Sequence, residues 1–131
     1  MKKIEDEADV KLLVDTFYER LINDSMLQSY FLNALPHKEA HLENMYKFWN
    51  NILFYRGGYM GNPLQIHQQI HHFLPLNKLL FDRWLQLFNE TLDELFTGEK
   101  AALAKQRSYA IATVMQLKIL PQIDADPEII Y

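Results

Sequence analysis

The chain has 131 residues, with 13 basic and 17 acidic side chains and a formal net charge of −4. This balance offers no basic surface for nucleic acid or an anionic membrane, and the absence of cysteine excludes disulfides and metal sites held by thiolates. Apolar residues make up 49% of the sequence, enough for the core of one domain spanning 1–131. No apolar stretch has the length of a signal peptide or a membrane span, so we expect a cytoplasmic protein.

Apolar residues recur at three- and four-residue steps from the start of the chain, which is the spacing of an amphipathic helix. The first stripe comprises Val10, Leu13, Val14, Phe17, Leu21 and Ile22. Tyr18 lies inside this stripe, so the helix is expected to bury a phenol. A shorter segment, 26–35, follows and ends at Pro36, because proline cannot continue a helix from its preceding residue.

A third helix is expected to stop at Gly57-Gly58, and it carries an imidazole on its apolar face. That face comprises His41, Met45, Phe48, Trp49 and Ile52. A short fourth helix should begin at Asn62-Pro63, since asparagine is a good N-cap and proline suits the first helical position. His67 then shares one face with Leu64 and Ile70. A histidine held in an apolar wall can ligate a haem iron, although most such histidines simply bond to a carbonyl.

Two longer helices complete the expected fold. The inner face of the fifth helix is expected to comprise Phe81, Trp84, Leu85, Phe88, Leu92 and Leu95. Gly98 is expected to cap its C-terminus. The sixth runs from about 99 to 119, with Leu103, Ala110, Ile111, Val114 and Leu117 facing in. Pro121 and Pro127 should break the final residues, leaving 120–131 as a tail. No segment alternates like a strand, so we predict an all-α domain with its core in about 8–118.

Three polar side chains share these apolar faces, namely Tyr18, His41 and Trp84. Each can donate a hydrogen bond. A gas ligand such as dioxygen gains negative charge when haem iron binds it, and each buried donor aimed at that charge contributes roughly 1.5–3 kcal/mol. Aromatic residues at helical spacing more often only fill a core, so neither Tyr18 nor Trp84 alone indicates such a pocket.

Four dispersed segments together resemble the bacterial truncated haemoglobins of group III. They are Phe17-Tyr18-Glu19, His41 seven residues before Phe48-Trp49, Gly61-Asn62-Pro63-Leu64 leading to His67, and Phe81-Asp82-Arg83-Trp84-Leu85-Gln86-Leu87-Phe88. The likeness covers about 8–118, in the same order and spacing. It implies a two-over-two helical sandwich around haem b. The glycine pair at 57–58 departs from the usual group III pattern, but it lies in an expected loop.

The resemblance also implies a role for each candidate pocket residue. His67 would be the proximal iron ligand, Tyr18 the distal tyrosine, His41 the distal-helix histidine, Trp84 the distal tryptophan, Phe31 a packing residue on the haem face and Met45 part of the distal wall. A five-coordinate iron would bind dioxygen, nitric oxide or carbon monoxide, and a polar distal pocket suits slow dioxygen release. Detoxification of nitric oxide or peroxide, or other redox chemistry of dioxygen, would need an external reductase.

Two other interpretations remain open. His37 and His41 are four residues apart, as are His67 and His71, which suits a non-haem metal site in a helical bundle. The acidic residues lie mostly off the apolar stripes, which disfavours that site. A helical interaction module without a cofactor leaves the inward tyrosine and tryptophan unexplained. Three further residues could pair with haem propionates, namely Arg56, His71 and His72.

Overall fold

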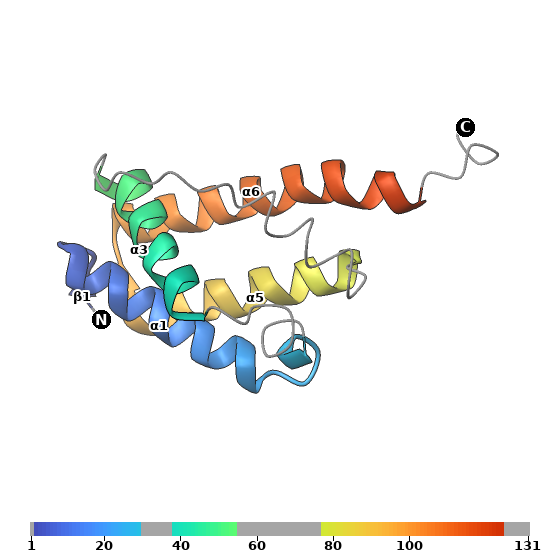
Figure 1. Cartoon of the computed structure of the whole chain (residues 1–131). Coiled ribbons are helices and arrows are strands. Elements are labelled where there is room, and N and C mark those ends of the chain that lie inside the picture. The colour runs from blue at the N-terminus through green and yellow to red at the C-terminus, as the bar shows by residue number, and fades with distance from the viewer. Residues whose placement is uncertain (1, 30–37, 55–76, 125–131) are drawn as a thin grey trace.

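A computed structural model describes residues 2–29, 38–54 and 77–124 of the chain (Figure 1). The elements within these ranges are β1 (Lys2–Lys3), α1 (Glu7–Asn23), α3 (Lys38–Phe54), α5 (Lys78–Leu95), β2 (Phe96–Thr97) and α6 (Glu99–Asp124). Long helices therefore dominate the described part of the chain, as the sequence predicts. The short helix expected around His67 lies outside these ranges, and most of the one expected at 26–35 does too.

Side-chain caps determine where two of the helices begin. Asp6 precedes α1 and accepts the backbone N–H of Asp9 at 3.1 Å, while the Asp9 carboxylate accepts the backbone N–H of Glu5 at 2.8 Å. This exchange satisfies N–H groups that have no partner inside the helix. Asn77 caps α5 in the same way, accepting the N–H of Leu80 at 3.0 Å.

The helices pack in pairs around one main core. α1 lies against α3 and α5, and α6 lies against α5 and α3. Figure 1 shows α6 and α5 extending from the end where they join, with α3 passing near that end and α1 on the side of α5 away from α6. The largest fully buried apolar side chains are Phe88, Leu13, Leu21, Leu53 and Leu92. Each such side chain contributes roughly 1.5–3 kcal/mol when it leaves water. The predicted inner stripe of α1 is confirmed except at its end, since Val10, Leu13, Val14, Phe17, Tyr18 and Leu21 are buried while Ile22 is half-buried.

The expected cap at Gly98 is wrong. Phe96 caps α5, and Phe96 and Thr97 are extended because they pair in parallel with Lys2 and Lys3. Gly98 follows this pair with a φ of +94°, a conformation that favours glycine. A Cβ there would also lie 3.1 Å from Cγ of Lys3. The glycine therefore turns the chain from β2 into α6, against the N-terminal strand.

The expected end of α6 is wrong, and its expected inner face is only partly right. The helix continues through Pro121 to Asp124. Proline removes one helical hydrogen bond, but its fixed φ of about −65° is compatible with a helical backbone. The expected inner face is only partly right, since Leu103 and Ile111 are half-buried against the core but Ala110, Val114 and Leu117 are exposed. The residues that are buried instead are Ala101, Ala104, Ser108, Ala112 and Met115. Apart from Met115 these side chains are small, and α6 packs against α5.

None of the helices within residues 2–29, 38–54 and 77–124 combines the length and apolar composition needed to cross a bilayer.

Candidate functional site

Tyr18 and His41 meet in the interior, where α1 passes the start of α3. Each is 8% exposed, and the Tyr18 hydroxyl shares a hydrogen bond with Nε2 of His41. Their ring centroids lie 5.2 Å apart with the ring planes at 75°. Buried polar groups require such partners, because an unpaired one forfeits its hydrogen bonds to water. The two helices thus bring a phenol and an imidazole together in an apolar environment.

Burial also controls the protonation of Tyr18. Removal from water raises the pKa of its hydroxyl well above the ordinary value of 10.0, because the charged phenolate would be poorly solvated. The hydroxyl therefore keeps its proton at neutral pH. A protonated phenol can donate one hydrogen bond and still accept another through its oxygen.

A network of aromatic rings connects Tyr18 with Trp84. The Phe17 ring makes edge-on contacts with Tyr18 at 5.8 Å, Trp84 at 5.4 Å and Phe88 at 4.9 Å between centroids. Trp84 also stacks on Phe88 at 5.8 Å with almost parallel rings, and Trp49 stacks on Phe88 at 5.0 Å. Helices α1, α3 and α5 therefore hold Trp84 through interlocked rings. Such contacts restrict where an indole can lie.

The structure brings together four of the candidate residues, Tyr18, His41, Met45 and Trp84. Met45 is 9% exposed and lies one helical turn after His41 on α3. Phe31 and His67 fall outside the described residues, as do His37, His71, His72 and Arg56. Their predicted roles therefore remain predictions.

The described residues leave partly exposed apolar surface that fits a largely apolar cofactor. Phe48, Ile52 and Trp84 are only half-buried against the core, so they keep apolar surface that a further apolar group could cover. The polar groups near this apolar surface are the Tyr18 hydroxyl and the His41 imidazole, which are hydrogen-bonded to each other. Within the three described ranges, no group of three histidine, cysteine, aspartate or glutamate residues is placed to hold a metal ion.

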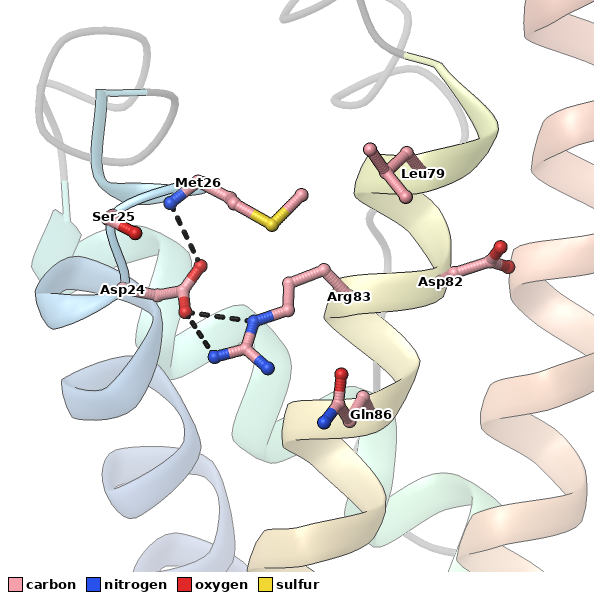
Figure 2. Close-up of a pocket in the computed structure, with 7 residues that line it drawn as sticks. All are labelled: Asp24, Ser25, Met26, Leu79, Asp82, Arg83 and Gln86. Carbon is pink, nitrogen blue, oxygen red and sulfur yellow. Dashed lines mark hydrogen bonds and ion pairs between the residues drawn. The ribbon is translucent and has the colours of Figure 1, made fainter.

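A separate cavity of about 260 Å³ lies where the end of α1 meets the start of α5 (Figure 2). Its wall contains an ion pair in which Arg83 donates through Nε and Nη2 to Oδ1 of Asp24, at 2.9 and 2.6 Å. The hydrogen bonds from Arg83 hold the pKa of the Asp24 carboxyl below its usual value. Sequence reasoning missed this pair, although Arg83 directly precedes Trp84 in one of the motifs.

Comparisons with known proteins agree on one family. Residues 2–119 match the sequence profile of the bacterial-like globins. A group 3 truncated hemoglobin (ctb) of Campylobacter jejuni is 29% identical over 114 residues, which cover 84% of this chain and 87% of that relative. The crystal structure of a group III truncated hemoglobin from Campylobacter jejuni matches with a TM-score of 0.81 at 28% identity, covering 91% of this chain and 95% of that one. These findings confirm the truncated-globin fold and the group III resemblance.

Proposed function

Because the chain belongs to the bacterial-like globin family, we propose that it binds one haem b and that the haem iron binds dioxygen, nitric oxide or carbon monoxide. When bound, the haem would supply the coordination position at which the gas is held. The observation that supports this function most strongly is the buried Tyr18–His41 pair within the aromatic network. A core that needed only to be filled would not require two polar side chains there.

Tyr18 is proposed as the main hydrogen-bond donor to the gas ligand. Its hydroxyl retains a proton because burial raises its pKa. In the structure this hydroxyl is bonded to Nε2 of His41. If Nε2 carries a proton and donates to the phenolic oxygen, the Tyr18 proton becomes available to the ligand. Hydrogen bonds in such a chain strengthen one another.

Trp84 is proposed as a second donor, through its indole N–H. Its contacts with Phe17 and Phe88 hold the ring at the half-buried edge of the network. A hydrogen bond to a charged acceptor contributes about 1.5–3 kcal/mol, so two donors would slow ligand release by several orders of magnitude at most. Slow release suits sensing, scavenging or redox chemistry better than bulk transport.

His41 is proposed to act as a gate and not as an iron ligand. Its bond to Tyr18 leaves Nε2 engaged, which supports a five-coordinate iron in the absence of gas. Met45, one turn further along α3, would form the neighbouring part of the distal wall, and Phe31 would pack on the haem face. Detoxification of nitric oxide or peroxide by this pocket would draw electrons from an external reductase.

His67 is proposed as the iron ligand on the strength of the sequence motif, since it lies outside the described residues. The test is haem retention after gel filtration, read from ferric, ferrous and carbon monoxide spectra. His67→Ala should lose the haem unless imidazole is added, whereas His37→Ala, at a histidine to which the resemblance gives no role toward haem, serves as the matched control. Unchanged ferric and ferrous spectra in His67→Ala would overturn the assignment.

A further inference from the structure

The Asp24–Arg83 pair joins the two helices that carry the proposed donors. Asp24 directly follows α1, on which Tyr18 lies, and Arg83 belongs to α5, on which Trp84 is the next residue. Figure 2 shows the guanidinium of Arg83 reaching across from α5 to the carboxylate. The Asp24 side chain is 6% exposed and that of Arg83 is 30% exposed. A charged pair so shielded from water holds its geometry better than an exposed one.

The carboxylate of Asp24 is itself held in place. Its Oδ2 accepts the backbone N–H groups of Met26 and Leu27, both at 3.2 Å, while Oδ1 receives both contacts from Arg83. The aspartate therefore caps the turn after α1 and anchors α5 with the same side chain. A fixed acceptor of this kind leaves Arg83 little freedom to move along or around its helix.

A second contact between the same helices lies two turns further along α5. Arg20 of α1 donates to Oγ1 of Thr91 at 3.2 Å and pairs with the exposed Glu94.

The Asp24–Arg83 pair anchors the part of α5 nearer its start, where Trp84 lies. Neighbouring residues on a helix diverge by about 100°, so a rotation of α5 that breaks the Arg83 contact must also swing Trp84. A rotation of about 10° would move an indole N–H by about 1 Å, enough to spoil a hydrogen bond.

We propose that Asp24 and Arg83 are positioning residues for Trp84. They set the rotation of α5 against α1, and hence the position of the indole relative to the Tyr18 hydroxyl. This inference rests on the proposed function, because it gives the indole its role toward the gas ligand. Neither residue touches that ligand. Their effect passes through Trp84.

The first test compares dioxygen release from three variants of the haem-loaded chain. Asp24→Asn and Arg83→Lys should each release dioxygen about 3- to 10-fold faster, since 1 kcal/mol is roughly a fivefold change. Asp82→Asn is the matched control. Asp82 lines the same cavity and loses the same charge, but it pairs with Lys78 within α5 and is 49% exposed. Its release rate should stay within about 1.5-fold of wild type.

The second test separates positioning from general loosening of the fold. In a Trp84→Phe background, Asp24→Asn should cause no further change in the release rate, because residues that act through one group are not additive. A further acceleration there would overturn the proposal. If Trp84→Phe alone leaves the release rate unchanged, the donor role of Trp84 fails, and the positioning proposal falls with it.

The third test does not depend on ligand release. The chain has 2 tryptophans, so an NMR spectrum of the indole N–H groups contains two signals, and Trp84→Phe identifies one of them. The Trp84 signal should shift in Asp24→Asn and in Arg83→Lys, and it should shift more than the signal of Trp49, which lies on α3 and contacts α5 through Phe88. An unmoved Trp84 signal in both variants would contradict the proposal, whatever the release rates are.

Discussion

Two hydrogen-bonded pairs tie α1 to its neighbours, and they differ in charge and in surroundings. Tyr18–His41 joins α1 to α3 deep in the core, and its tyrosine is neutral because burial raises the pKa of the hydroxyl. Asp24–Arg83 joins the end of α1 to α5 at the wall of a cavity, and both members are charged. A bond between neutral groups contributes about 0.5–1.5 kcal/mol, and one between charged groups more.

The difference in charge suits the two pairs to different roles. The phenol can exchange hydrogen-bond partners at small cost when a ligand approaches, because it is uncharged. The carboxylate and guanidinium cannot, since separating them would leave the largely buried carboxylate of Asp24 without its charged partner. The first pair is suited to act on a ligand, and the second to hold the frame in which that ligand is bound.

Breaking the charged pair should produce the largest loss of stability. Asp24→Ala removes both the ion pair and the cap on Met26 and Leu27, so we expect the free energy of unfolding to fall by about 2–3 kcal/mol. Asp24→Asn retains part of the cap and should lose about 1 kcal/mol. Denaturant unfolding measures both. Equal losses in the two variants would show that only the charge matters.

The charged pair should also make stability depend on pH. The pKa of Asp24 is lower in the folded protein, so its contribution is present above the unfolded value of about 4 and is lost as the pH falls through the folded-state pKa. Arg83 faces this carboxylate from α5, and Asp82 also lines the cavity. The stability gap between wild type and Asp24→Asn should therefore shrink below about pH 4. A gap that is constant down to pH 2 would contradict the linkage.

Removing the Tyr18–His41 hydrogen bond should lower the free energy of unfolding much less than breaking the charged pair. Tyr18→Phe deletes one hydroxyl from a buried site and removes its hydrogen bond to Nε2 of His41. We therefore expect the free energy of unfolding to fall by about 1 kcal/mol or less. Thermal and denaturant unfolding of the same samples provide the measurement. A loss larger than that of Asp24→Ala would reverse the comparison between the two pairs.

The smallest expected effect concerns His41. As a gate, it should control entry more than release, so His41→Ala is expected to change carbon monoxide association by about threefold and to leave its dissociation nearly unchanged, because less than 1 kcal/mol is involved. Flash photolysis measures both rates. A ferrous spectrum of six-coordinate, bis-histidine type that disappears in His41→Ala would show that the histidine ligates the iron.

The sequence predicts some of these features well and others hardly at all. The inner stripe of α1 is predictable because its large apolar residues occupy one face. In α6 they occupy both faces, so the pattern could not show that Ala104 and Ser108 are buried while Leu117 is 68% exposed. The two-residue strands β1 and β2 are too short to show any periodicity.

The candidate site divides in the same way. The polar residues Tyr18, His41 and Trp84 could be selected because they interrupt apolar stripes and match a family pattern. The Asp24–Arg83 pair could not, since its members are 59 residues apart and lie outside those stripes. An ion pair between distant segments produces no periodic pattern in the sequence from which it could be predicted. Only the packing of α1 against α5 brings its two members together.

The central claim is that the buried polar groups act on a gas ligand and do not merely fill the core. Stopped-flow measurement of dioxygen release from the haem-loaded wild type, Tyr18→Phe and Trp84→Phe tests it most directly. We predict that each variant releases dioxygen about tenfold faster or more, because each loses a hydrogen bond to a charged acceptor. Release rates within about twofold of wild type in both variants would contradict the claim.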